Sequence, residues 1–211
     1  MESKLLLFDD SFEKRYSAYV RISHYINSFD GTKIAIDAYL PSTNGNKITD
    51  SKVPTILICR REQRRKYNSD NSVERLLPLV YDGYALVVLE LRGCGVSYGI
   101  NDSFGSKEHC EDIAATSSWI RKQVWSNGLV AMQGASNRAY YQLCTISRFP
   151  KSLDVLTMGC AVGDMYYNNH PNGVSCLPTI CFKEEKKKLL SKEEFYQKND
   201  PVDEDIDGQM V

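Results

Sequence analysis

The residues best suited to chemistry in this sequence stand together at positions 134–138, which read Gly-Ala-Ser-Asn-Arg. A buried strand is expected just before them and a helix just after them. A serine on such a strand–turn–helix junction projects its hydroxyl above the sheet, where it can attack a carbonyl carbon. The backbone N–H of Asn137, near the helix N-terminus, would point toward the developing oxyanion. The pattern makes Ser136 a candidate acyl-transfer nucleophile, but a Gly-x-Ser match taken alone favours a serine that only caps the helix.

Hydrophobic periodicity predicts the elements that would position this serine. Around the turn at Asp30-Gly31, two segments alternate apolar and polar side chains, which indicates an antiparallel hairpin whose second strand ends at Pro41. Continuous apolar runs farther along the chain are typical of strands buried on both faces of a parallel sheet. Strands are therefore expected at residues 19–27, 34–38, 55–59, 85–89, 129–132 and 154–158, and helices at 73–81, 107–123 and 137–147. This order predicts an α/β fold, with a mostly parallel sheet and an antiparallel N-terminal hairpin.

Composition restricts the classes of partner and cofactor. The 26 basic and 27 acidic residues nearly cancel, so nucleic acid and anionic membranes are not expected as partners. No run reaches the ~20 apolar residues that a membrane-spanning helix needs. The seven cysteines include no Cys-x-x-Cys pair, so we expect no zinc site, no disulfide framework and no cofactor, and a reducing cytoplasmic location.

Three other motifs suggest chemistry that we do not expect. Glycines 93, 95 and 99 follow a strand, but they lack the lysine of a P-loop and the spacing of a dinucleotide fold, which favours a structural loop. The pair His109-Cys110 opens like a phosphatase loop, but Thr116 stands where that chemistry needs an arginine. A basic cluster over residues 60–66 is expected to be a solvated loop rather than an anion site.

Several segments, in the same order, resemble the cocaine esterase and X-prolyl dipeptidyl-peptidase family. Residues 119–136 are similar to the segment that leads to the family's nucleophile, and residues 90–99 to its Asp-x-Arg-Gly-x-Gly-x-Ser-x-Gly stretch. Residues 30–35 resemble its opening hairpin, and Asp82-Gly83-Tyr84 its helix-to-strand turn. The resemblance covers roughly residues 20–170. It implies an α/β-hydrolase that cleaves acyl esters or X-Pro peptides through an acyl-serine at Ser136.

The sequence also departs from the pattern of that family. A serine nucleophile needs a general base, and His170 is the only histidine after Ser136. We expect His170 to be a loop histidine, because the family's acid and base come from later strands. The family's oxyanion-hole tyrosine falls at residues 60–64, which contain no tyrosine, and the tyrosine that usually follows the nucleophile is Asn137. The backbone N–H of Asn137 remains as a donor.

Three segments are expected from these observations. Residues 1–18 form an N-terminal extension, residues 19–165 a partial α/β-hydrolase core, and residues 166–211 the start of a helical cap and an acidic tail. The chain is predicted to be a truncated or degenerate serine hydrolase, and the alternative is a catalytically inactive binding or interaction protein. A small acyl ester or peptide is the expected substrate if the chain is active. Because the sheet lacks strands on one side, a homo-oligomer or pairing with another chain is also expected.

Overall fold

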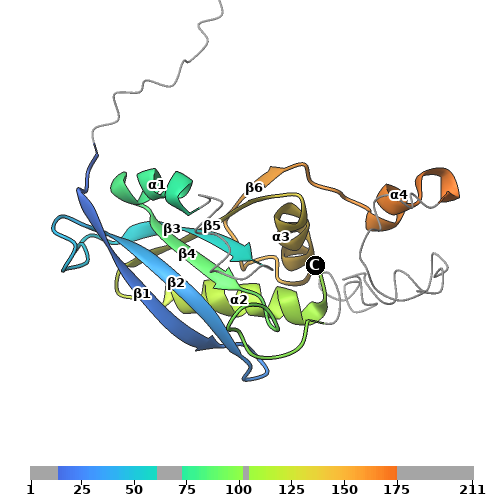
Figure 1. Cartoon of the computed structure of the whole chain (residues 1–211), viewed down its shortest axis with the longest axis horizontal. Coiled ribbons are helices and arrows are strands. Elements are labelled where there is room, and N and C mark those ends of the chain that lie inside the picture. The colour runs from blue at the N-terminus through green and yellow to red at the C-terminus, as the bar shows by residue number, and fades with distance from the viewer. Residues whose placement is uncertain (1–13, 61–72, 102–104, 175–211) are drawn as a thin grey trace, which may run out of the picture.

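The computed structural model describes residues 14–60, 73–101 and 105–174, which form a six-stranded sheet with helices on both faces (Figure 1). The strand order is β1-β2-β4-β3-β5-β6. Only β2 runs against its neighbours, and the remaining pairs are parallel. The strands are β1 (Ala18–Asn27), β2 (Lys33–Ser42), β3 (Val53–Arg60), β4 (Ala85–Glu90), β5 (Ser126–Ala135) and β6 (Val155–Gly159). The helices are α1 (Leu77–Tyr81), α2 (Lys107–Arg121), α3 (Asn137–Arg148) and α4 (Met165–Asn169). The predicted α/β fold is confirmed.

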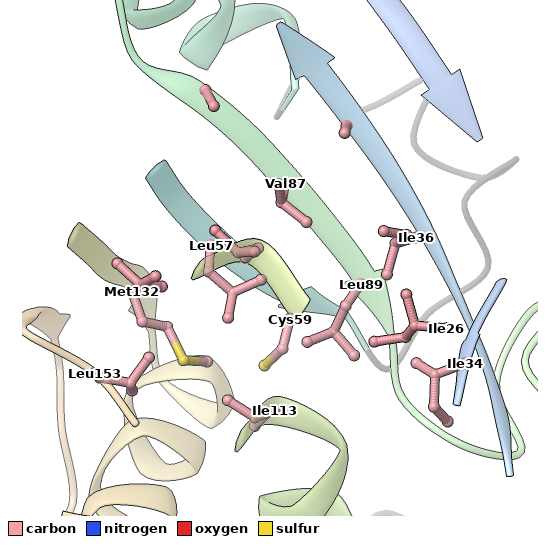
Figure 2. Packing of buried hydrophobic residues seen from close by; sticks show 14 of the residues in the cluster. Ile26, Ile34, Ile36, Leu57, Cys59, Val87, Leu89, Ile113, Met132 and Leu153 are labelled. Carbon is pink, nitrogen blue, oxygen red and sulfur yellow. The ribbon is translucent and has the colours of Figure 1, made fainter. Parts of the chain in front are cut away.

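The larger core lies between the sheet and the helices α2 and α3. Strand residues such as Leu57 and Cys59 are fully buried there, and they pack with Ile113 of α2 and Tyr141 of α3. Figure 2 shows Ile113 extending from its helix toward the strand side chains that include Cys59 and Leu89. Burial of an aliphatic side chain of this size contributes about 1.5–3 kcal/mol each, so this layer holds β5 and α3 in place.

A smaller core covers the opposite face of the sheet, under α1. Val80 of α1 is fully buried against Ile58 of β3 and Val88 of β4. Strands β3 and β4 therefore carry apolar side chains on both faces, which explains their continuous apolar sequence. Their burial fixes the centre of the sheet, to which β5 is added.

Two of the expected boundaries that differ from the structure do so for identifiable reasons. Strand β2 continues through Pro41, which pairs with Tyr19 of β1; β4 pairs with β2 only as far as Tyr39, so Pro41 has no strand on that side. The helix expected at residues 73–81 is regular only in α1, after a 3₁₀ turn at Glu74–Leu76. Pro78 lies in the first turn of α1, where a missing N–H costs nothing.

Parts of the expected organisation lie outside the described residues, namely most of the N-terminal extension and the acidic tail. Residues 14–17 precede β1 without a regular element. After β6 the chain forms α4 and a 3₁₀ turn at Pro171–Gly173. Across the described ranges, no helix combines the length and the apolar character that crossing a bilayer requires.

Candidate active site

Ser136 stands at the junction between β5 and α3 in an unusual backbone conformation. Its φ of 55° and ψ of −121° lie in a region that residues with a side chain rarely adopt. The backbone N–H of Ser136 donates to the carbonyl of Gly159 on β6 at 2.9 Å, and its own carbonyl accepts from Ala139 at 2.9 Å and Tyr140 at 3.1 Å. These bonds to β6 and to α3 hold the strained residue, and conformations of this kind gather at functional sites.

Gly134 allows the turn to be this tight. A Cβ at this position would lie 2.2 Å from the Cβ of Arg138 and 3.2 Å from the backbone carbon of Arg138. Helix α3 therefore passes so close to β5 that only glycine fits at position 134. The second glycine of the usual Gly-x-Ser-x-Gly pattern is replaced by Arg138, whose Cβ fills the space that Gly134 leaves open.

The Ser136 hydroxyl is not used to cap α3. Ser136 occupies the N-cap position, but its side chain makes no capping hydrogen bond, and the residue is exposed. The capping alternative therefore lacks the bond that defines it. Asn137 is the first residue of α3, so its backbone N–H has no carbonyl to bond one turn earlier in the helix. An exposed hydroxyl and a neighbouring N–H at a helix N-terminus are two of the groups that acyl transfer to serine requires, and a general base is the third.

Cys160, which the sequence pattern did not single out, lies beside Ser136. Ala135 and Gly159 are register partners in the β5–β6 ladder, so Ser136 and Cys160 are the next residues of two adjacent strands. Cys160 is exposed and has a φ of 51°. Neighbouring strands lie about 4.8 Å apart, so the backbones of Ser136 and Cys160 are close at this end of the sheet. The sequence feature that could have identified Cys160 is its position directly after a strand, which is also the position of Ser136.

The glycine-rich loop after β4 encloses a carboxylate of the chain itself. The Glu90 side chain is fully buried and accepts from the backbone N–H of Val96 at 3.0 Å. A Cβ on Gly95 would lie 2.4 Å from that carboxylate. Ser97 donates to the Glu90 carbonyl and accepts from the Ala35 N–H, which ties the loop to β2. The Glu90 side chain therefore fills the place that a bound phosphate would need, and these contacts agree with a structural loop.

Arg92 joins two of the segments that resemble the family, residues 30–35 and residues 90–99. Its guanidinium donates to both carboxylate oxygens of Asp112 on α2, at 2.9 and 2.6 Å, and to Asp30 in the β1–β2 turn at 2.8 Å. The Arg92 and Asp112 side chains are 7% and 0% exposed, so this is a buried ion pair. The hydrogen bond from Arg92 holds the pKa of Asp30 well below its usual range. The role of these charged residues is to join the hairpin, the loop and α2.

His170 makes contacts within its own helical turn. Its ring stacks on Tyr166 with centroids 4.6 Å apart, and its Nδ1 lies 3.2 Å from the Tyr166 carbonyl. The two aspartates between Ser136 and His170 have structural partners. Asp164 accepts from Tyr167 and caps α4, while Asp154 pairs with Arg121 and accepts from the backbone of Val130.

The position of Asp154 separates it from the candidate nucleophile. Asp154 accepts a hydrogen bond from the N–H of Val130, which lies six residues before Ser136 on the same extended strand. At about 3.3 Å for each residue, the two sites are roughly 20 Å apart. Asp154 therefore does not orient a base for Ser136.

Arg60 is the first residue of the segment, 60–64, in which the family has its oxyanion-hole tyrosine. It ends β3 and is 3% exposed, so the expectation of a solvated basic loop is wrong for this residue. The rest of the segment, residues 61–72, lies outside the described residues. Within the described ranges, no group of three or more His, Cys, Asp or Glu side chains could hold a metal ion.

Comparison with protein families agrees with this geometry. Residues 30–210 match the model of the family described as X-Pro dipeptidyl-peptidase (S15 family). A Mycobacterium bovis protein assigned as a serine esterase is 31% identical over 141 residues, which cover 58% of this chain and 21% of that protein. The cocaine esterase of a Rhodococcus species is 29% identical over 140 residues, covering 65% of this chain and 23% of the esterase. The chain thus spans about a fifth of the length of these curated relatives.

A solved structure gives the same result for the fold. The CocE/NonD family hydrolase of Staphylococcus aureus superimposes with a TM-score of 0.54 and 25% sequence identity, covering 69% of this chain and 28% of the hydrolase. The six-stranded, mostly parallel sheet with its antiparallel hairpin is thus the arrangement of an α/β-hydrolase-like protein.

Proposed function

Because the chain belongs to the X-Pro dipeptidyl-peptidase (S15) family of serine hydrolases and esterases, we propose that Ser136 is the nucleophile of an acyl-transfer site for esters or X-Pro peptides. The observation that carries the proposal is the conformation of Ser136, with φ of 55° between β5 and α3. A backbone in this region is costly and is retained where it presents a side chain for a purpose. Here it presents an exposed hydroxyl next to a helix N-terminus.

The proposed reaction begins with attack of the Ser136 Oγ on the carbonyl carbon of the substrate. The proton of the hydroxyl passes to a general base, and the carbonyl oxygen becomes an oxyanion. The N–H of Asn137 donates to that oxyanion, and the positive end of α3 adds to its stabilisation. Collapse of the tetrahedral species expels the alcohol or amine and leaves an acyl-serine, which water then hydrolyses.

The general base is proposed to come from outside the described residues. His170 is held by Tyr166, and both preceding aspartates have structural partners. A site with nucleophile and oxyanion donor but no base is slower by several orders of magnitude. The alternative function, ligand or partner binding without turnover, follows if nothing supplies this base.

A fluorophosphonate probe tests the nucleophile. We expect covalent labelling of the full chain, lost in Ser136→Ala and kept in Ser51→Ala, which replaces an exposed loop serine. Mass spectrometry of the labelled peptide identifies the site. Labelling that persists in Ser136→Ala, or its complete absence from the folded wild type, would contradict the proposal.

Turnover of 4-nitrophenyl acetate separates the two candidate functions. Labelling of Ser136 together with Ser136-dependent turnover supports the hydrolase. Because the probe reacts only with an activated serine, the absence of both labelling and turnover supports the binding alternative.

A further inference from the structure

Gln142 is a buried amide on α3, six residues after Ser136. Its side chain is 0% exposed. The Nε2 of Gln142 donates to the carbonyl of Arg138 at 3.2 Å and to the carbonyl of Thr157 on β6 at 3.3 Å. One amide group therefore links the first turn of α3 to the strand β6.

The two carbonyls determine how the Gln142 amide is oriented. Both carbonyls are acceptors, so the NH₂ group must face them and Oε1 must face away. This Oε1 is buried and has no hydrogen-bond partner among the described residues. A buried acceptor without a partner costs free energy, whereas an apolar side chain of similar size, such as methionine, would fill the space without that cost. Packing alone therefore does not account for an amide at this position.

The bonds of Gln142 complete a closed ring of hydrogen bonds around the junction between β5 and α3. The Ser136 N–H donates to Gly159 of β6 at 2.9 Å, and Gln142 donates to Thr157, two residues earlier on the same strand. On the helix, Gln142 donates to Arg138, two residues after Ser136. The short segment from Ser136 to Arg138 is thus bonded to β6 at both ends, once directly and once through Gln142.

Asn137 lies between the two fixed ends of this segment, and its N–H is the oxyanion donor of the proposed reaction. Acyl transfer needs this N–H and the Ser136 hydroxyl in a fixed relation, because a displacement of about 1 Å can reduce a rate about a hundredfold. We propose that Gln142 is a positioning residue that fixes Ser136 and the Asn137 N–H relative to each other. It acts through the backbone carbonyls of Arg138 and Thr157, and its value for catalysis rests on the proposed function of Ser136.

Two substitutions on α3 separate positioning from a general loss of stability. Gln142→Met removes both bonds of the amide and keeps a side chain of similar length and volume. Thr145→Val is the matched control, because Thr145 is also fully buried and its Oγ1 donates to the carbonyl of Tyr141 at 2.7 Å. Each variant removes buried hydrogen bonding from the same helix, but only the bonds of Gln142 reach β6.

Hydrogen exchange of the Ser136 amide measures the placement directly in the full chain. This N–H is bonded to Gly159, so its exchange requires the junction to open. The amide of Leu57, in the central strand β3, reports global unfolding and serves as the reference. In Gln142→Met we expect the Ser136 amide to exchange about tenfold faster, beyond any change at Leu57. In Thr145→Val we expect no change beyond that at Leu57.

The rate of fluorophosphonate labelling of the folded chain is the functional readout, which a merely structural role would not change. We expect it to fall about tenfold in Gln142→Met and to stay at the wild-type value in Thr145→Val. An unchanged rate in Gln142→Met would overturn the positioning role, as would equal acceleration of exchange at Ser136 and Leu57. A wild type that is not labelled would remove the proposed function instead, while faster exchange at Ser136 in Gln142→Met would still support its placement by Gln142.

Discussion

At the scale of single residues, Ser136 combines a backbone cost with an exposed functional group. Holding a residue with a side chain at φ of 55° costs about 1–3 kcal/mol. Bonds to Gly159 and to the first turn of α3 maintain this conformation. Because the hydroxyl makes no capping hydrogen bond, the side chain does not offset the energetic cost of the strained backbone. Stability and presentation of the hydroxyl are therefore opposed at this position.

Ser136→Gly should stabilise the folded chain while removing the nucleophile. Glycine adopts positive φ without strain, so we expect a gain of about 1 kcal/mol after the larger chain entropy of unfolded glycine is subtracted. Ser136→Ala keeps the Cβ and should leave stability near that of the wild type. Urea unfolding followed by tryptophan fluorescence measures both variants. A destabilised Ser136→Gly variant would show that the backbone is not strained there.

Gly134→Ala should destabilise the chain and also displace Ser136. The new Cβ would overlap Arg138, so α3 must move away from β5, at a cost of about 1–3 kcal/mol. Gly163→Ala is the control, because nothing lies within 4 Å of the corresponding Cβ. Thermal unfolding and the rate of fluorophosphonate labelling give the two readouts. Equal behaviour of the two variants would contradict the close β5–α3 approach.

At the scale of elements, one buried arginine joins segments that are distant in the sequence. Arg92 follows β4, Asp112 lies on α2 and Asp30 lies in the turn between β1 and β2. The loop between them closes over the buried Glu90. Charged residues that look like a binding motif in the sequence therefore hold the hairpin and α2 against the end of the central strands.

Arg92→Met should be strongly destabilising because it leaves the Asp112 carboxylate buried without its partner. Breaking a buried pair in this way costs about 3–5 kcal/mol. Lys47→Met removes the exposed pair with Asp50 and should cost less than about 1 kcal/mol. The free energies of unfolding in urea compare the two variants. A small loss for Arg92→Met would mean that water or a neighbour compensates Asp112.

At the scale of the whole molecule, buried thiols make stability depend on alkaline pH. Burial raises the pKa of Cys59 and of Cys110 from 9.0 to about 12. The unfolded chain then loses these protons between pH 9 and 12 while the folded chain keeps them. The stabilisation is complete below pH 9 and is lost as pH rises toward 12.

We expect the free energy of unfolding to fall by about 1 kcal/mol for each of these thiols between pH 8 and 10. Urea titrations at several pH values measure the slope. The double variant Cys59→Ala/Cys110→Ala, although less stable at neutral pH, should have a flatter profile over this interval. An unchanged slope in the double variant would assign the pH dependence to other groups.

Much of the fold was accessible from local sequence patterns. Apolar runs predicted the buried strands because β3 and β4 carry core on both faces. The boundary errors arose where context decides: β2 passes through Pro41 because β4 does not reach it. The start of α1, in contrast, does not depend on tertiary context, because Pro78 marks the first turn of the helix in the sequence. For the candidate site, the sequence located Ser136 and Asn137, but not their surroundings.

The sequence by itself determined the junction at Ser136, because that depends on neighbouring residues: a strand, Gly134, the serine and a helix. Only the tertiary structure decided that the residues after β5 and β6, Ser136 and Cys160, are neighbours, and that Asp154 bonds to Val130, six residues before Ser136. Arg92 and Asp30 likewise meet across 62 residues of sequence. Such contacts follow from strand order and register, which are set by packing of the whole core and leave no local pattern in the chain.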